Sequence, residues 1–145
     1  MDLNLVDAEL IPTLEARPEF DIWADLSVTR LLSLQRNTHL ASMLPPIENI
    51  GTADYIVPQS GDEGVPVRVY GPKSQTNVLP ALLWIHGGGY CFGSLMGDDY
   101  TVKRMAEAIG CVVISVDYRL APEFPFPTPL NDCYAALTWV FDNAE

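Results

Sequence analysis

A histidine followed by three glycines gives this sequence its clearest chemical signal, in the segment HGGGY at residues 86–90. Glycine has no Cβ and adopts positive φ readily, so the backbone N–H groups of successive glycines can converge on one point. Such a nest binds an anion without using a charged side chain. In acyl transfer the anion is the oxygen of a tetrahedral intermediate, and one preformed donor there stabilises the transition state by about 2.7–4 kcal/mol. The glycine run is therefore a candidate oxyanion hole.

Two other interpretations of the glycine run stay open. A tight turn that needs glycine for packing would use the same residues. A phosphate nest is the second alternative, although the pattern GxxxxGK[ST] is absent and the third glycine position of GxGxxG falls on Phe92. As a general base, His86 would need a nucleophile and a carboxylate, and the sequence places neither nearby. We therefore expect the His86 ring to bond the backbone and fix the loop.

Cys91 is the centre of a Gly-x-Cys-x-Gly pattern that resembles a nucleophile elbow. An elbow sits on a sharp turn that leads from a strand directly into a helix. The strand here is expected to end near Ile85 and the helix to start near Asp98, about a dozen residues later, so Cys91 is predicted to be an ordinary loop cysteine. The cysteines are too widely spaced for a disulfide framework or a CxxC metal knuckle: Cys91, Cys111 and Cys133. No metal or cofactor is implied.

A parallel strand pair with a helix between its strands is expected to present the glycine run. Residues 79–85 are a continuous apolar run and residues 111–116 are nearly another, which is typical of strands covered on both faces. Asp98 and Asp99 are predicted to cap the start of the helix, and Gly110 to follow its last turn. Its expected buried face consists of Val102, Met105, Ala106 and Ile109. Such a βαβ unit places the glycine run at the carboxyl end of a strand, where α/β proteins bind ligands.

The elements on either side of this unit complete an α/β pattern. Residues 53–57 and 65–70 are predicted to form an antiparallel hairpin, joined by the polar turn SGDEG. A last helix is expected over residues 130–144, after a proline-rich loop. Its apolar face is predicted to consist of Leu130, Tyr134, Leu137 and Phe141. The fold class is therefore α/β, with an antiparallel hairpin followed by a βαβα unit.

The N-terminal residues are predicted to be helical, in two pieces. The first follows apolar residues at helical spacing, broken by prolines: Leu3, Val6, Leu10 and Leu14, with Pro12 and Pro18. The second covers about residues 25–42 and is stopped by the proline pair at 45–46. These helices precede any strand, so they are expected to form an appendage to the sheet.

Composition and charge exclude several classes of function. The chain has 145 residues, 48% of them hydrophobic, and a formal net charge of −11, so a packed core is expected. An acidic balance disfavours nucleic-acid and anionic-membrane partners, because both require Lys and Arg. The longest apolar run, residues 78–85, is too short to span a membrane. The first ten residues lack the basic region of a secretory signal, so a cytoplasmic location is expected by default.

Two motifs together resemble one protein family. HGGGY at residues 86–90 is followed, one strand later, by VDYRLAPEFPFP at residues 116–127. The pair is similar to the hormone-sensitive-lipase-like branch of the α/β hydrolases, which is rich in bacterial carboxylic ester hydrolases. An HGGG run between a strand and a helix forms the oxyanion hole of such lipases and esterases. The resemblance covers residues from about 48 to the end.

The resemblance implies roles for individual residues. Gly88 and Gly89 would supply the oxyanion N–H groups. The rest of the motif would support the loop: His86, Gly87 and Tyr90. Asp117 and Arg119 would brace the loop at the mouth of the second parallel strand. A purely structural role for residues 117–127, as a rigid connection fixed by proline, stays open beside this.

The sequence departs from the family pattern in its catalytic triad. The family's serine sits in a Gly-Asp-Ser-Ala-Gly-Gly elbow on the strand after the last helix expected here, and the acid and the histidine follow it. No serine in this sequence has glycine at both −2 and +2, and no histidine follows His86. The triad would therefore lie beyond Glu145. Residues 1–46 are then expected to be a helical cap segment, and residues 47–145 the N-terminal half of an α/β-hydrolase domain.

Residues and resemblance together predict the N-terminal part of a serine carboxylic ester hydrolase that acts on small, uncharged acyl esters. Its sheet would be a partial α/β-hydrolase sheet that carries the oxyanion-hole loop. The chain alone is predicted to be inactive, and a complementing C-terminal half would be its partner. The alternative function is a non-catalytic module that binds a small ligand, or a pseudoenzyme, on the same fold.

Overall fold

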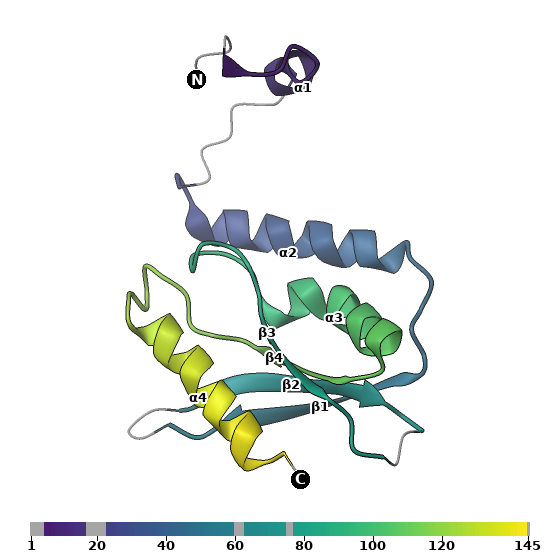
Figure 1. Cartoon of the computed structure of the whole chain (residues 1–145). Helices are drawn as coiled ribbons and strands as arrows, with labels where there is room; N and C mark the ends of the chain where they lie inside the picture. Colours follow the sequence, from purple (N-terminus) through teal and green to yellow (C-terminus); the bar gives the residue numbers. More distant parts are fainter. Residues whose placement is uncertain (1–4, 17–22, 60–62, 75–76, 145) are drawn as a thin grey trace.

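The computed structural model describes residues 5–16, 23–59, 63–74 and 77–144. Its elements, in chain order, are α1 (Ile11–Glu15), α2 (Leu26–Ser42), β1 (Ile50–Val57), β2 (Val65–Pro72), β3 (Ala81–Ile85), α3 (Leu95–Ile109), β4 (Val112–Val116) and α4 (Thr128–Asp142). The strands form one sheet in the order β1-β2-β4-β3 (Figure 1). The predicted fold class, a hairpin followed by a βαβα unit behind helical N-terminal residues, is confirmed.

The register of the sheet brings the two loops that follow the parallel strands to the same edge. Strands β1 and β2 pair antiparallel, as do β2 and β4, whereas β3 and β4 pair parallel. In that parallel pair Ala81 lies opposite Val112 and Ile85 lies opposite Val116. The carboxyl ends of β3 and β4 are therefore neighbours, and the segments that follow them leave the sheet side by side. Strand β3 is an edge strand of this sheet.

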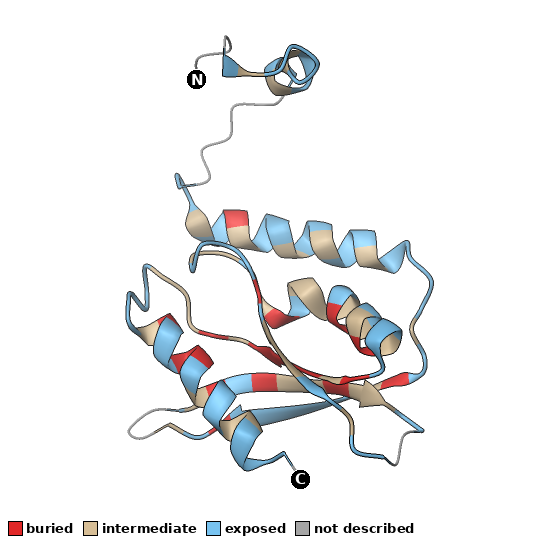
Figure 2. Cartoon of the chain, viewed as in Figure 1, coloured by how far each residue is buried: buried red, intermediate tan, exposed pale blue. Residues whose placement is uncertain are grey.

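Helices cover both faces of the sheet, and each face has its own core (Figure 2). Successive side chains of a strand point to opposite faces, so Val113 and Ile114 of β4 enter different layers. The layer under α3 consists of Ile50, Tyr70, Val102, Ala106, Cys111 and Val113. The layer that includes α4 consists of Val57, Val65, Val67, Ile114, Val116, Tyr118, Cys133 and Ala136. Helix α2 packs on α3, on the side away from the sheet (Figure 1).

The first predicted helix is much shorter than its apolar pattern suggested. Helix α1 has five residues and buries none of them, and Leu10 precedes it rather than lying within it. Pro12 stands in its first turn, where a missing N–H costs little. Leu3 and Pro18 of the pattern lie outside the described residues. The second predicted helix, over residues 25–42, is confirmed as α2, with Asp25 as its N-cap.

The predicted start of the helix between β3 and β4 is wrong by one turn. Ser94 is the N-cap of α3, and its Oγ accepts a hydrogen bond from the Gly97 N–H at 3.1 Å. Asp98 and Asp99 lie inside the helix and accept bonds from side chains of the sheet instead: Trp84 Nε1 to Asp98 at 2.9 Å and Tyr70 Oη to Asp99 at 3.0 Å. The two carboxylates therefore accept hydrogen bonds from side chains of the sheet and do not cap the helix.

The rest of the α3 prediction is confirmed for Gly110, Val102 and Ala106, whereas Met105 is only half-buried. Gly110 adopts φ 71° after the last turn, the left-handed conformation predicted for it. Val102 and Ala106 are completely buried, but Ile109 is 58% exposed and does not belong to the buried face. The helix ends at Ile109.

The Ser94 cap gives a prediction about stability. Replacing Ser94 by alanine removes the side-chain acceptor of the Gly97 N–H and leaves only the Ser94 carbonyl, so the free energy of unfolding should fall by about 1 kcal/mol. Urea denaturation followed by circular dichroism measures it. Ser33→Ala, at an exposed position inside α2, is the control and should change stability by less than about 0.5 kcal/mol. Equal effects of the two substitutions would contradict the capping assignment.

The face of α4 that packs on the sheet was predicted wrongly. The four residues expected to be buried are exposed: Leu130, Tyr134, Leu137 and Phe141. The face that packs inward consists of Pro129, Asp132, Cys133 and Ala136, and α4 begins at Thr128. An ion pair to Arg119 places the carboxylate of Asp132 inside, which turns the apolar stripe outward. Within the described residues, no helix combines the length and apolar character needed to cross a bilayer.

Candidate active site

The candidate site lies where two loops leave the carboxyl ends of the parallel strands. We call residues 86–94, between β3 and α3, the glycine loop, and residues 117–127, between β4 and α4, the proline loop. The Ala121 N–H donates to the Tyr90 carbonyl at 2.8 Å, so the two loops are joined directly. In α/β folds this edge of the sheet is where ligands bind.

The backbone carbonyls of the first three residues of the glycine loop, His86, Gly87 and Gly88, all have hydrogen-bond partners. The Tyr118 hydroxyl donates to the His86 carbonyl at 2.7 Å, and His86 Nδ1 lies 3.0 Å from the Gly87 carbonyl. The Gly88 carbonyl accepts bonds from the N–H groups of Cys91 at 3.1 Å and Phe92 at 3.0 Å. Three successive peptide planes are therefore fixed.

Fixing these carbonyls also fixes the direction of the N–H groups. In a trans peptide the C=O of one residue and the N–H of the next point in opposite directions. The Gly88 and Gly89 N–H groups therefore point away from the groups that hold the Gly87 and Gly88 carbonyls. Gly87, Gly88 and Gly89 are exposed, and no residue of the described chain accepts a hydrogen bond from the Gly88 or Gly89 N–H. Two adjacent amide donors are thus left to face solvent.

This loop geometry requires glycine at two positions. Gly88 has φ +127° and Gly93 has φ +92°. A Cβ on Gly88 would fall on the Phe92 carbonyl, and a Cβ on Gly93 would fall on the His86 ring, both well inside 3.0 Å. A Cβ on Gly89 would meet nothing within 4 Å, although its φ of +59° is left-handed. Within the three-glycine run, Gly88 is therefore required by sterics and Gly89 only by its backbone conformation. Neither reason applies to Gly87.

Tyr90 continues the left-handed backbone without being glycine. Its φ is +61°, a conformation that is unusual for an aromatic residue and costs roughly 1–3 kcal/mol. The bond from Ala121 N–H to its carbonyl holds it there. Its ring lies edge-on to the Tyr118 ring, with a centroid distance of 5.9 Å, and is about half exposed. The ring is therefore partly exposed to solvent where the two loops meet.

His86 is a support for this loop rather than a free base. Its side chain is buried, and its ring stacks on Tyr118 with a centroid distance of 4.1 Å. Because Nδ1 faces a carbonyl oxygen, we place a proton on Nδ1, whereas Nε2 is buried and has no hydrogen-bond partner among the described residues. Burial raises the pKa of Tyr118 to about 12, so its hydroxyl stays protonated and donates to the His86 carbonyl. The expectation that the His86 ring bonds the backbone is thus met.

Asp117 and Arg119 lie at the base of the proline loop and tie it to two helices. Asp117 Oδ1 accepts a bond from the N–H of Leu95, the first residue of α3, at 3.0 Å. A carboxylate at this helix end also interacts favourably with the helix dipole. Arg119 reaches α4, where it pairs with Asp132. Both residues therefore brace neighbouring elements, and their part in function stays a prediction.

The Arg119–Asp132 pair is the most buried ion pair of the described chain. The carboxylate of Asp132 is completely buried and accepts bonds from Arg119 N, Nε and Nη2, with a further bond from Gln59 at 3.1 Å. Burial opposes ionisation, but the bonds from Arg119 and Gln59 outweigh it and hold the pKa of Asp132 below its usual range. The guanidinium also lies over the Phe124 ring, 5.2 Å from its centroid.

Sequence reasoning missed two residues of this site. Arg30 of α2 donates from Nε to the Cys91 carbonyl at 2.7 Å, across 61 positions of the chain. Asp132 was hidden in what looked like an exposed polar position of a helix. Asp132 is a single acidic residue in the second turn of α4, shortly after the motif that contains Arg119. That placement could have indicated an ion pair. No local pattern could have indicated Arg30.

Neither Cys91 nor a metal-binding cluster forms a second candidate site among the described residues. Cys91 lies in the loop, and α3 begins at Leu95, so the prediction that Cys91 is not on a strand-to-helix elbow is confirmed. All three cysteines are free. In the part of the chain that the structure describes, no three His, Cys, Asp or Glu side chains gather so that they could hold a metal ion.

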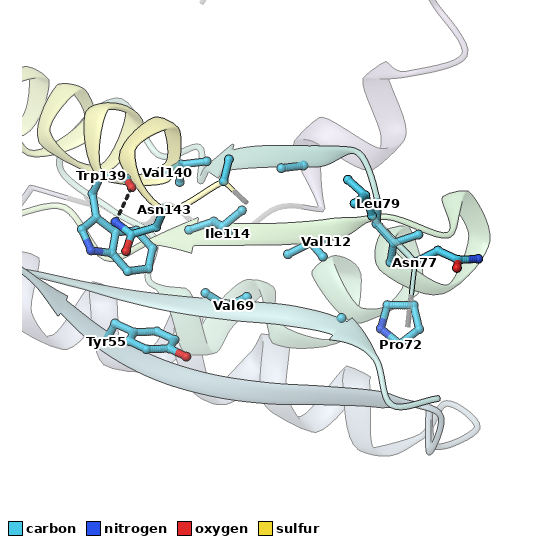
Figure 3. Close-up of a pocket in the computed structure, with 14 residues that line it drawn as sticks. Tyr55, Val69, Pro72, Asn77, Leu79, Val112, Ile114, Trp139, Val140 and Asn143 are labelled. Atoms are coloured by element: carbon cyan, nitrogen blue, oxygen red, sulfur yellow. Dashed lines mark hydrogen bonds between the residues drawn. The ribbon is translucent and has the colours of Figure 1, made fainter. Parts of the chain in front are cut away.

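A separate pocket of about 550 Å³ lies between α4 and the sheet, away from the glycine loop (Figure 3). Tyr55 and Trp139 stand at one end of it, and Pro72 and Asn77 at the other. Asn143 donates to the Trp139 carbonyl at 2.8 Å on its wall. No residue of the glycine loop lines it, so this pocket does not carry the oxyanion chemistry.

A four-stranded sheet of this order, with a glycine loop at the carboxyl end of a parallel strand, defines part of an α/β hydrolase. A family model described as the alpha/beta hydrolase fold matches residues 82–145. An arylesterase of Saccharolobus solfataricus is 36% identical over 110 residues, which are 76% of this chain and 36% of that protein.

Solved structures agree with the sequence comparison. The carboxylesterase EstE1, from a metagenomic library, superposes with a TM-score of 0.77 at 41% identity, over 86% of this chain and 42% of that one. An esterase of the bacterial hormone-sensitive lipase family superposes with a TM-score of 0.69 at 29% identity, over 94% and 42%. The chain spans less than half the length of each of these relatives. The chain therefore has part of the α/β hydrolase fold, and it is similar to hormone-sensitive-lipase-like carboxylesterases.

Proposed function

We propose that this chain supplies the oxyanion-hole loop of a serine carboxylic ester hydrolase that acts on small, uncharged acyl esters. One observation carries the proposal. The Gly87 and Gly88 carbonyls have hydrogen-bond partners within the loop, so the Gly88 and Gly89 N–H groups point the opposite way. Neither N–H group donates a hydrogen bond to a described residue. Donors that are oriented before the substrate arrives need no reorganisation during the reaction.

The chemistry follows from the charge that develops on an ester carbonyl. Attack by a nucleophile turns the carbonyl oxygen into an oxyanion, and two amide donors at about 2.7–3.1 Å would stabilise it. Each donor contributes about 2.7–4 kcal/mol in the transition state, because it interacts more strongly with the oxyanion than with the carbonyl. The roles of His86 and Tyr118 are then to hold the carbonyls whose peptides carry these donors.

The serine, the acid and the histidine of the triad are proposed to come from residues outside this chain. In the family's strand order the elbow strand pairs with the strand that corresponds to β3, and β3 lies at the edge of the sheet. A complementing C-terminal half would add its first strand there. The division at residues 46 and 47, the cytoplasmic location and the absence of nucleic-acid partners stay predictions.

Amide chemical shifts test the oxyanion donors directly. Titration of the ¹⁵N-labelled chain with acetate, a small oxyanion, should shift the amide signals of Gly88 and Gly89. The Gly110 amide is the internal control, because it already donates to the Ala106 carbonyl and should not move. If the Gly88 and Gly89 signals do not respond, the two amides do not form an anion site.

Catalysis requires the missing half, so it is tested in a chimera. This chain should hydrolyse p-nitrophenyl acetate no faster than background alone. When it replaces the matching part of EstE1, the chimera should show turnover that a serine-reactive phosphonate abolishes. Phosphonate-sensitive turnover by the isolated chain would contradict the proposed division of residues. Acetate binding together with an inactive, folded chimera would favour the alternative of a non-catalytic binding module.

A further inference from the structure

Arg30 reaches out of α2 and bonds both loops of the candidate site. Its Nε donates to the Cys91 carbonyl of the glycine loop at 2.7 Å, and its Nη2 donates to the Ala121 carbonyl of the proline loop. The side chain is only 23% exposed. One planar guanidinium therefore fixes two backbone carbonyls that belong to different loops.

A carboxylate orients this guanidinium. Glu123 accepts from Nη1 at 2.9 Å and from Nη2 at 3.0 Å, which is a bidentate arrangement. The hydrogen bonds from Arg30 hold the pKa of the Glu123 carboxyl below its usual range. Bidentate pairs add geometric specificity, so Glu123 sets the plane in which Arg30 meets the carbonyls. Its side chain is more than half exposed, and its contribution to stability is correspondingly small.

The bonds of Arg30 continue into the peptide that carries the Gly89 donor. Arg30 holds the carbonyl of Cys91, and the N–H of Cys91 donates to the Gly88 carbonyl. That carbonyl and the Gly89 N–H belong to the same peptide plane. A parallel connection runs from Arg30 to the Ala121 carbonyl, while the Ala121 N–H holds Tyr90.

The same end of α2 makes a second contact with the glycine loop. The ring of Trp23, just before α2, lies 5.7 Å from the ring of Phe92, at an angle of 51°. The Phe92 N–H is the other donor to the Gly88 carbonyl. Both residues that hold this carbonyl are therefore contacted from the N-terminal end of α2.

From these contacts we infer that Arg30 is a positioning residue for the oxyanion hole. It holds Cys91, Cys91 holds the Gly88 carbonyl, and that carbonyl directs the Gly89 N–H. The helical segment that precedes the sheet thus sets the geometry of the donors without touching the substrate. The inference rests on the proposed function for its catalytic meaning, but its structural part can be tested alone.

Hydrogen exchange in the full chain tests the structural part. In Arg30→Met the N–H groups of Cys91, Phe92 and Ala121 should exchange roughly 10- to 100-fold faster, the range expected when hydrogen bonds to a charged group are lost. The Asp117 N–H, bonded to the Pro66 carbonyl, should keep its rate. A merely structural role would accelerate all four together, because the whole chain would unfold more often. Unchanged exchange at Cys91 and Phe92 would overturn the inference.

Two further variants sharpen this test. Arg36→Met, at an exposed position of the same helix, should leave all four rates within about twofold. Arg30→Lys keeps the positive charge but lacks the planar guanidinium with its several donors. It should therefore also accelerate exchange of the Cys91 and Phe92 N–H groups and leave the exchange rate of Asp117 unchanged. If Arg30→Met does not fold, Arg30→Lys alone tests the positioning role of Arg30. Wild-type rates in Arg30→Lys would show that charge alone suffices and would overturn the positioning role.

The catalytic part is measured in the chimera with EstE1. Arg30→Met should lower kcat roughly 10- to 100-fold and leave KM within about twofold, because misplaced donors weaken the transition state more than substrate binding. Arg36→Met should change neither parameter. A rise in KM with unchanged kcat would overturn the inference. Failure of the proposed function itself would be seen separately, as wild-type Gly88 and Gly89 signals that ignore acetate.

Discussion

Replacing Asp132 by alanine should lower the free energy of unfolding by about 3–5 kcal/mol, which is the usual cost of breaking a buried ion pair. The carboxylate is completely buried, and its removal takes a charged partner away from the Arg119 guanidinium, which is only 24% exposed. A domain of ordinary stability has about 5–15 kcal/mol in total. The variant should therefore be close to its unfolding transition at room temperature.

Urea denaturation of matched variants tests whether burial is the cause. Glu107→Ala breaks the Arg104–Glu107 pair, which lies on the surface of α3, and should cost less than about 0.5 kcal/mol. The double variant Arg119→Met with Asp132→Leu removes both charges and should be more stable than Asp132→Ala, because the guanidinium is removed together with the buried carboxylate. Similar losses for Asp132→Ala and Glu107→Ala would contradict this account.

The same carboxylate should make stability depend on pH in the acid range. Asp132 has a lowered pKa in the folded chain, so the unfolded chain binds its proton more readily. Its contribution is then present above the unfolded pKa, near 3.9, and is lost as the pH falls through the lower folded value. Asp132→Asn should have a flatter stability profile below about pH 4 than the wild type. Parallel profiles would show that other carboxyl groups cause the acid dependence.

The sheet and the glycine loop could be predicted because their signals are local. Strand β3 is a continuous apolar run, and the HGGG segment follows it directly. The inward face of α4 could not be predicted from periodicity, because an ion pair to Arg119 turns Asp132 inward and Leu130 outward. The cap of α3 failed in the same way, since Asp98 bonds Trp84 of the sheet rather than the helix end. Tertiary partners decided each of these cases.

In the candidate site, too, some features could be predicted from local sequence and others depend on tertiary contacts. Gly88 and Gly89 could be named from sequence because the HGGG segment resembles that of a known family, and glycine adopts positive φ readily. What directs their N–H groups is a set of partners that come from three segments, and Arg30 is the most distant of them. The proposed chemistry of the site can therefore be inferred from the sequence, whereas the contacts that orient its N–H groups are seen only in the fold.

Replacing Gly88 by alanine should have the largest effect on function of any substitution in the loop. Its Cβ would overlap the Phe92 carbonyl, and φ +127° is a conformation that alanine avoids. The Gly88 carbonyl must then leave its two donors, so the Gly89 N–H loses its direction. In the chimera with EstE1, kcat should fall about 10²- to 10³-fold, the loss expected for one oxyanion donor. In the isolated chain, the response of the Gly89 amide to acetate should disappear.

Two neighbouring glycines provide a graded control, because Gly89 lacks the steric overlap of Gly88, and Gly87 lacks both the overlap and the positive φ. Gly89→Ala meets no atom within 4 Å but must adopt φ +59°, which costs roughly 1–2 kcal/mol and leaves the N–H in place. Gly87→Ala meets no atom and has no positive φ, so it should be nearly silent. The order of kcat should therefore be wild type, Gly87→Ala, Gly89→Ala and, far below, Gly88→Ala. A Gly88→Ala chimera as active as Gly87→Ala would show that the direction of the Gly89 N–H does not matter for the reaction.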